Sequence, residues 1–291
     1  MKLRLPILIV LLAVGVWILP RVAPLAKERA REFLVDPIHL QVASAPDWFA
    51  ATVEPSLRAE LATLAPTPLR DDDEVLALAH AIERSSGWVR SVDRLEKRYP
   101  NQLEVELSLR EPVAMVESGS GLVLVDADGV IVAPATDSAD FLASHDLPLV
   151  HGPRALRDAT PGARVRDAQL EEGLRVAVEL LPHRATLAER ELHLDVIDVT
   201  AQQRGAGRAL TDVELYTRQG LAIEWGRAST NPKLGALEPA ADAKVRGLLR
   251  LAARYPELAG IRRIRLQFDK PYVVFAEDSP LAYAPAGART P

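Results

Sequence analysis

An uncharged apolar run near the start of the chain sets the first constraint on its fold. Residues 5–20 have the sequence LPILIVLLAVGVWILP, and basic residues lie on both sides. About 20 apolar residues cross a bilayer as a helix, and the run approaches that length when it extends to Pro24 while Arg21 snorkels to the interface. We therefore expect a transmembrane signal anchor over residues 5–24, in contact with the lipid bilayer, after a short cytoplasmic tail of residues 1–4.

A cleaved signal peptide is the alternative, because it has the same basic start and apolar centre. Cleavage requires a small residue as the last residue of the signal peptide and another small residue two positions before it. A cut after Ala26 would place Pro24 at the earlier position, and a cut after Ala23 would place Arg21 there. Neither cut fits, so we favour the anchor. The basic residues are about as numerous after the run as before it, so the positive-inside rule does not decide the orientation.

The composition describes the remainder of the chain as globular and acidic. The chain has 291 residues, 48% of them hydrophobic and 26% charged, which is enough for one large or two small domains. Cysteine is absent, which excludes disulfides, thiolate metal sites and a cysteine nucleophile. Residues 1–35 contain six basic and two acidic residues and so carry a net charge of +4. The whole chain has a net charge of −5, so the remaining residues carry −9. An acidic body argues against nucleic acid as a partner.

The first part of the body has the pattern of a small mixed domain. Residues 25–37 are predicted to form a juxtamembrane helix and linker that ends at Pro37. Apolar periodicity then predicts a strand, two helices and two strands in turn, over residues 38–44, 56–65, 71–87, 89–97 and 103–110. Three aspartates begin the second helix, where the helix dipole explains them better than a cation site. We expect a β-α-α-β-β domain over residues 38–116, in which two helices cover one face of a three-stranded sheet.

The second part of the body is predicted to be a larger mixed β domain with helices on one side, over residues 117–279. Helical stripes occur at residues 167–183 and 241–258. Short apolar strands surround them, at residues 192–199, 212–217, 221–227, 261–268 and 271–277. The pattern is lost in residues 280–291, which we predict to be a disordered tail. The fold class is therefore α+β.

Few residue patterns indicate chemistry. Asp126-Ala-Asp128-Gly129 lies between two apolar runs, which is typical of a hairpin turn. A calcium loop would need its glycine two places later and a glutamate at its twelfth position. Ser120 lacks the Gly-x-Ser-x-Gly pattern. His193 and Asp195 share a strand face and could form a pair, but a structural contact or plain exposure is favoured over a catalytic dyad. We expect no catalytic residue, no metal site, no cofactor and no small-molecule substrate.

Three stretches together resemble the bacterial cell-division proteins FtsQ/DivIB: residues 87–116, then LVLVDADGVIV at 122–132 and LPLVHGP at 147–153. In that family a polypeptide-transport-associated (POTRA) domain ends in a Trp-Val strand, a turn with proline, an alternating strand and a Glu-Arg-x-Pro-like motif. The next domain opens with a Val-Asp-x-x-Gly hairpin. The chain departs from the pattern where the Glu-Arg pair appears as Arg110-Glu111, and where the turn before Pro100 is one residue longer.

The resemblance implies a single-pass protein of the bacterial cytoplasmic (inner) membrane, with most of the chain in the periplasm or outside the cell. It would act as a divisome scaffold that binds FtsB/FtsL-like small coiled-coil membrane proteins and regulates septal wall synthesis. In the family the last strands bind FtsB by strand addition, and a long apolar edge strand is suited to this role. Carried over by position, the partner-binding residues are Phe268, Tyr272, Val274 and Phe275.

Other interpretations stay open at this point. Two of the four residues, alternating along the strand, would belong to the core if the strand only completes the sheet. A POTRA-bearing membrane protein of outer-membrane assembly or secretion would have the same first domain. An unrecognised periplasmic hydrolase is the third interpretation, because catalytic triads are assembled in space rather than along the chain.

Overall fold

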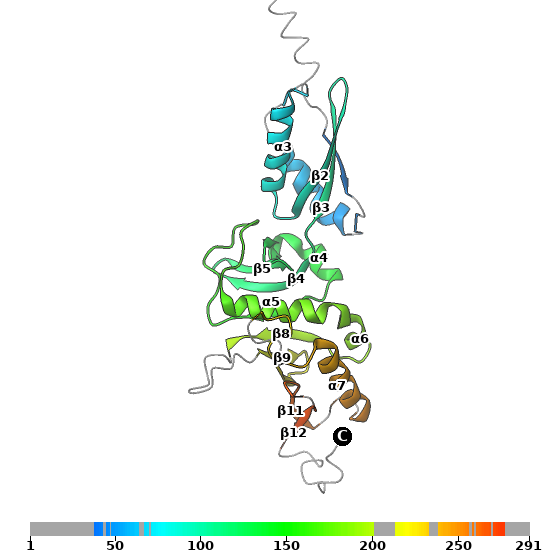
Figure 1. Ribbon diagram of the computed structural model, residues 1–291, viewed down its shortest axis with the longest axis vertical. Coiled ribbons are helices and arrows are strands. Elements are labelled where there is room, and N and C mark those ends of the chain that lie inside the picture. The colour runs from blue at the N-terminus through cyan, green and yellow to red at the C-terminus, as the bar shows by residue number, and fades with distance from the viewer. Residues whose placement is uncertain are drawn as a thin grey trace, which may run out of the picture. The chain divides into compact units, whose positions relative to one another are not determined.

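The chain divides into two compact units, Met1–Leu109 and Arg110–Pro291. The computed structural model (Figure 1) describes residues 38–42, 45–46, 48–63, 67–69, 71–200, 213–232, 238–255, 258, 260–268 and 270–276. The expected cytoplasmic tail, transmembrane anchor and juxtamembrane helix lie outside these residues, as does the predicted tail of residues 280–291. Among the described helices, none has both the length and the apolar composition that a membrane span needs.

The first unit is a three-stranded sheet with helices. Strand β1 (Ile38–Val42) is followed by the π-helix η1 (Phe49–Val53), helices α2 (Glu54–Leu61) and α3 (Asp72–Ser85), and strands β2 (Val89–Arg98) and β3 (Gln102–Leu109). The strands lie in the order β1-β3-β2, with β1 parallel and β2 antiparallel to β3. The element order expected from the sequence is thus present in this unit.

The alternation along β3 produces the core of the first unit. Leu103, Val105 and Leu107 are fully buried, whereas the residues between them are partly exposed. Helix α3 begins as predicted at an acidic cap: the Asp71 side chain accepts hydrogen bonds from the Asp73 and Glu74 backbone N–H groups at 3.0 and 3.2 Å. The aspartate cluster therefore starts a helix.

The described residues of the second unit form a nine-stranded mixed sheet with helices. The strands are β4 (Pro112–Ser118), β5 (Gly121–Asp126), β6 (Ile131–Pro134), β7 (Leu149–His151), β8 (Leu194–Asp198), β9 (Val213–Thr217), β10 (Ala222–Gly226), β11 (Ile261–Arg265) and β12 (Tyr272–Phe275). Their order is β12-β11-β10-β9-β8-β7-β4-β5-β6. The pairs β4/β7, β7/β8 and β10/β11 are parallel and the others antiparallel. The α+β class is confirmed.

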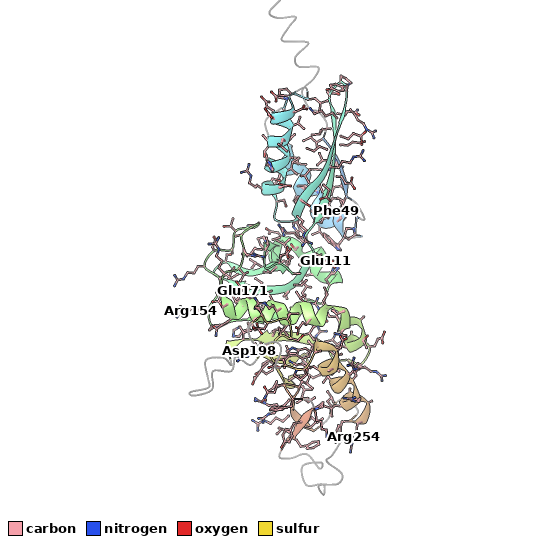
Figure 2. All side chains as sticks on the ribbon, in the orientation of Figure 1. Phe49, Glu111, Arg154, Glu171, Asp198 and Arg254 are labelled. Carbon is pink, nitrogen blue, oxygen red and sulfur yellow. The ribbon has the colours of Figure 1, made fainter. Side chains whose placement is uncertain are left out.

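Helices cover the core of this sheet. They are η2 (Ala135–Ser138), α4 (Ala139–Ser144), α5 (Ala168–Leu180), η3 (Leu181–His183), α6 (Arg184–Ala188) and α7 (Ala241–Arg254). Figure 2 shows the side chains that fill the space between these helices and the strands. Helix α5 lies so close to β7 that a Cβ atom built at Gly173 would be 2.5 Å from Val150 Cγ1. The absence of a side chain at Gly173 therefore allows α5 to pack closely against the sheet.

The boundary between the two units differs from the one expected. We expected the first domain to extend to residue 116, but the structure divides the chain after Leu109. The reason is β4, which pairs with β5 and β7 of the larger sheet and buries Val113 and Val116 in its core. Apolar alternation identifies a strand, but it does not say which sheet the strand joins.

The acidic turn after β5 holds the chain in a hairpin. One Asp126 side-chain oxygen accepts hydrogen bonds from the backbone N–H groups of Asp128 and Val130, at 3.0 and 2.8 Å. The other oxygen accepts a hydrogen bond from Arg110 Nη1 at 2.7 Å. Gly129 has a positive φ of 75°, as such a turn requires. The hairpin prediction is confirmed.

We expect Asp126→Ala to lower the free energy of unfolding by about 3–5 kcal/mol, because it leaves the largely buried Arg110 without its carboxylate. The shift of the urea denaturation midpoint measures the effect. Asp128→Ala is the matched control, since the Asp128 side chain is exposed in the same turn. Added Ca²⁺ should leave the midpoint of the unaltered chain unchanged, and a rise with Ca²⁺ would contradict the structural role.

Candidate functional site

The last strand, β12, lies at one edge of the nine-stranded sheet (Figure 1). It pairs antiparallel with β11 on one side, with Tyr272 opposite Arg265 and Val274 opposite Arg263. Within the described part of the chain, no strand pairs with its other side. An unpaired edge presents a row of N–H and C=O groups that another strand can bind.

The hydrogen bonds to β11 indicate which backbone groups of β12 face the open side. The Ala276 N–H donates to the Gly260 carbonyl oxygen at 2.9 Å, on the β11 side. Because successive residues of a strand direct their backbone groups to opposite sides, those of Tyr272 and Val274 face β11. The groups of Val273 and Phe275 then face the open edge.

The four residues predicted to bind a partner occupy different environments. Phe268, in the turn before β12, and Tyr272 are 55% and 58% exposed, which is high for large apolar side chains. Val274 is half-buried. Phe275 is half-buried and packs against the core, with its ring in edge-to-face contact with Tyr255 at a centroid distance of 5.8 Å. Of these four, Phe275 has the strongest contacts with the core.

Charged side chains lie beside Tyr272 on the neighbouring strands. The Glu224 carboxylate on β10 pairs with Arg263 Nη1 at 2.7 Å and with Arg265 Nε at 2.8 Å. The Arg265 guanidinium in turn lies 5.9 Å from the centroid of the Tyr272 ring, within cation–π range. We call this row of paired side chains, Glu224, Arg263 and Arg265, the charge ladder. It holds the exposed Tyr272 ring next to the open edge.

The same ladder continues to β9 and shifts two pKa values. The hydrogen bond that the Tyr216 hydroxyl donates to Glu214, at 2.7 Å, together with burial raises the pKa of Tyr216 to about 12. The hydrogen bond to Glu224 raises the pKa of Arg263. Both groups stay in their ordinary protonation states at neutral pH, so the ladder is a structural network of fixed charges.

The opposite edge of the sheet is covered. Strand β6 forms that edge, and residues 162–165 run beside it with backbone hydrogen bonds. The Ile131 N–H donates to the Ala163 carbonyl oxygen at 2.8 Å, and the Gly162 N–H donates to the Ile131 carbonyl oxygen at 2.7 Å. The two edges therefore differ, because one is closed by the chain itself and the other presents unpaired backbone groups.

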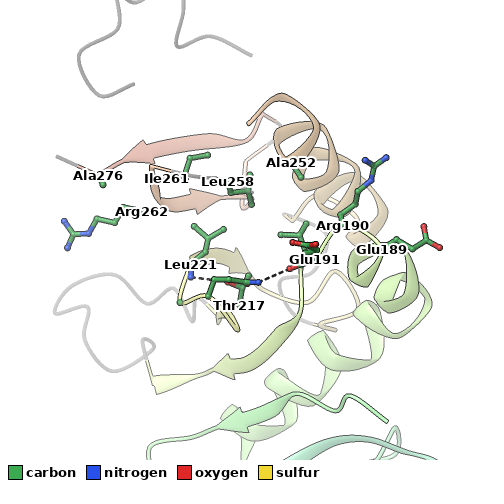
Figure 3. A pocket seen from close by; sticks show the side chains of 13 residues that line it. Glu189, Arg190, Glu191, Thr217, Leu221, Ala252, Leu258, Ile261, Arg262 and Ala276 are labelled. Atoms are coloured by element: carbon green, nitrogen blue, oxygen red, sulfur yellow. Dashed lines mark hydrogen bonds between the residues drawn. The ribbon is translucent and has the colours of Figure 1, made fainter. Parts of the chain in front are cut away.

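A pocket of about 690 Å³ begins where β12 ends (Figure 3). Ala276, the residue after β12, lines it together with apolar residues that include Leu221 and Ile261. Glu191 and Leu258 also line it, and they are the non-glycine residues of the described chain with a positive φ, 59° and 51°. Such backbone conformations are unfavourable and occur often at binding sites, so we include this pocket in the candidate site.

The residues that indicated chemistry in the sequence have structural partners. His193 Nδ1 lies 3.0 Å from an Asp146 carboxylate oxygen, and Asp195 instead accepts hydrogen bonds from Arg218. The Ser120 hydroxyl lies 3.1 Å from that of Ser118 in the tight turn between β4 and β5. Within the described ranges, no group of three or more His, Asp or Glu side chains is arranged to hold a metal ion. The absence of catalysis stays a prediction.

Some features of the site were not found in the sequence. The pocket at the end of β12 is built from residues far apart in the chain, so no local pattern marks it. Val273 has its backbone groups on the open edge but carries an ordinary apolar side chain packed against the core. The alternation of the strand was the only signal for its orientation.

Comparison with known proteins gives a partial match. No protein-family model matches the chain. A curated relative, the cell division protein FtsQ of Rhizobium radiobacter, is 34% identical over 109 residues, which are 37% of this chain and 48% of that protein. The alignment thus spans about half the length of the curated relative, and over that span the chain is similar to a cell division protein.

Proposed function

We propose that the chain is a non-enzymatic, single-pass scaffold of the bacterial cell-division machinery in the inner membrane. Its body would lie on the outer side, where it binds FtsB/FtsL-type small coiled-coil proteins and regulates septal wall synthesis. The open edge of β12, next to two exposed aromatic side chains, is the observation that carries this proposal. The similarity to FtsQ of Rhizobium radiobacter supports the division role.

The first unit and the apolar N-terminal run would complete the scaffold. A β-α-α-β-β order around a three-stranded sheet supports a POTRA domain in the first unit. The anchor over residues 5–24 rests on the sequence alone, where the uncharged run has nearly the length of a membrane span. A scaffold fixed to the membrane would hold its binding edge near small membrane partners.

Strand addition fits the chemistry of the edge. A partner strand would form hydrogen bonds with the backbone groups of Val273 and Phe275, which supply affinity without sequence selectivity. Exposed aromatic side chains beside a sheet edge are typical anchors of protein interfaces. Phe268 and Tyr272 have this exposure, and the Arg265 guanidinium fixes the Tyr272 ring. These side chains would select the partner.

We expect Val273→Pro to reduce partner binding about tenfold or more, because proline removes the N–H that faces the open edge and leaves the hydrogen bonds to β11 in place. Co-purification of FtsB/FtsL-type proteins with the full chain from its host measures binding. Val273→Thr keeps the N–H and the side-chain volume and is the matched control. Unchanged co-purification of the proline variant, with its circular dichroism intact, would contradict strand addition.

Photo-crosslinking in living cells tests which proteins meet the edge. A photo-reactive residue in place of Tyr272, and separately of Val274, should capture a small coiled-coil membrane protein that mass spectrometry identifies. Arg154 is the control position, because it is exposed in the same unit and points away from the fold (Figure 2). Capture of outer-membrane assembly or secretion components at Tyr272, in place of a division protein, would contradict the division role.

A further inference from the structure

A second pocket, of about 380 Å³, lies in the Arg110–Pro291 unit beside helix α6. The segment before β7, the end of α5, α6 itself and the start of β8 form its walls. Most of the lining is aliphatic and includes Leu180, Leu187, Leu192 and Leu194. The volume and the apolar lining suit a small ligand or one side chain of a larger one.

One cation, the Arg184 guanidinium, lines this apolar pocket without an ion pair. Arg184, the first residue of α6, lines the pocket and is only partly exposed. Its guanidinium donates one hydrogen bond, from Nη2 to the Val113 carbonyl oxygen. Among the described residues, no carboxylate lies within ion-pair distance of it, and the charges of Asp146 and Glu111 act on it from further away. Burial lowers the pKa of Arg184, and these two charges offset the effect only in part, so the guanidinium has lost water without a full replacement.

Asp146, the carboxylate that could pair with Arg184, already has two other partners. Asp146 also lines the pocket. One of its carboxylate oxygens lies 3.0 Å from His193 Nδ1, and the other accepts a hydrogen bond from Arg218 Nη2 at 2.9 Å. Asp146 is therefore held by two donors at the rim. The guanidinium N–H groups of Arg184 that make no hydrogen bond are then available to a group that enters the pocket.

A guanidinium offers a planar fork of N–H donors that matches the oxygens of a carboxylate or a phosphate. A partly desolvated cation at the wall of an aliphatic pocket is complementary to a ligand with an anionic head and an apolar body. We propose that this pocket binds an aliphatic carboxylate, with its carboxylate group on Arg184 and its chain against the leucines. The C-terminal residue of a peptide that ends in leucine, isoleucine or valine has this chemistry, and so does a free short-chain carboxylic acid.

This inference does not depend on the division role. Its test uses the full chain in lipid nanodiscs and two photo-reactive probes, a six-carbon carboxylic acid with a diazirine on its chain and the primary amide of the same acid. The acid should label residues 180–194, mapped by mass spectrometry, and excess unlabelled hexanoate should remove the labelling. The amide should label about tenfold less, because it cannot form a charge-assisted pair. Equal labelling by the amide would overturn the proposal.

Two pairs of variants separate the cation from the cavity. Arg184→Gln should lose labelling, while Arg154→Gln, which alters an exposed arginine outside both pockets, should keep it. Ala185→Leu fills the pocket from α6 and should also lose labelling, whereas Thr186→Leu alters the next residue of the helix, which does not line the pocket. The alanine variant keeps Arg184, so it tests the pocket even if Arg184→Gln does not fold. Full labelling of Ala185→Leu would overturn the proposal.

Competition distinguishes the two sources of the ligand. N-acetyl-leucine imitates the C-terminal residue of a peptide, and its amide is the matched control. Stronger competition by N-acetyl-leucine than by hexanoate would assign the pocket to a peptide C-terminus, and the reverse would assign it to a free carboxylic acid. Competition by N-acetyl-leucine amide as strong as that by the acid would count against a carboxylate site altogether.

Discussion

Two buried carboxylates on α5 hold the second half of the large sheet in place. Glu172 and Glu179 are nearly fully buried, and both accept hydrogen bonds from the segment that follows β10. Glu172 binds the Ala228 N–H at 2.9 Å, and Glu179 binds the Thr230 N–H at 2.8 Å. Burying a carboxylate costs free energy unless hydrogen-bond donors surround it. The segment after β10 supplies these donors, so its position and that of α5 depend on each other.

The same constraint reaches β12 through α7. Lys244 on that helix is fully buried and donates hydrogen bonds to the carbonyl oxygens of Trp225 and Arg227, at 2.7 and 2.9 Å. The helix is thereby fixed over the end of β10. Further along it, a Cβ atom built at Gly247 would lie 2.8 Å from Pro271 Cγ, the residue before β12. The edge strand is therefore positioned by a chain of contacts that begins at the buried acids of α5.

The sequence predicted the elements better than their assembly. The alternation of Leu103, Val105 and Leu107 placed the core of the first unit, and Asp126 marked the hairpin after β5 in the second unit, because both signals are local. Strand β4 belongs to the larger sheet because it pairs with β5 and with β7, and β7 is distant in the chain. Sequence reasoning noted only that His193 and Asp195 share a strand face, and it did not identify Asp146, which binds the histidine from another segment. At the candidate site, the aromatic residues were identifiable, whereas both pockets and the network behind α7 arise from tertiary contacts.

An open edge has to remain soluble when no partner is bound, and β12 has features that serve this need. It is four residues long, and charged side chains such as Arg265 and Lys270 lie next to it, which limits pairing between copies of the chain. Short length also limits the backbone hydrogen bonds that any strand can gain there. Selectivity must then come from side chains, and the exposed Phe268 and Tyr272 are placed to supply it. A short edge flanked by charges thus favours a partner that also fits these aromatic rings over one that only pairs its backbone.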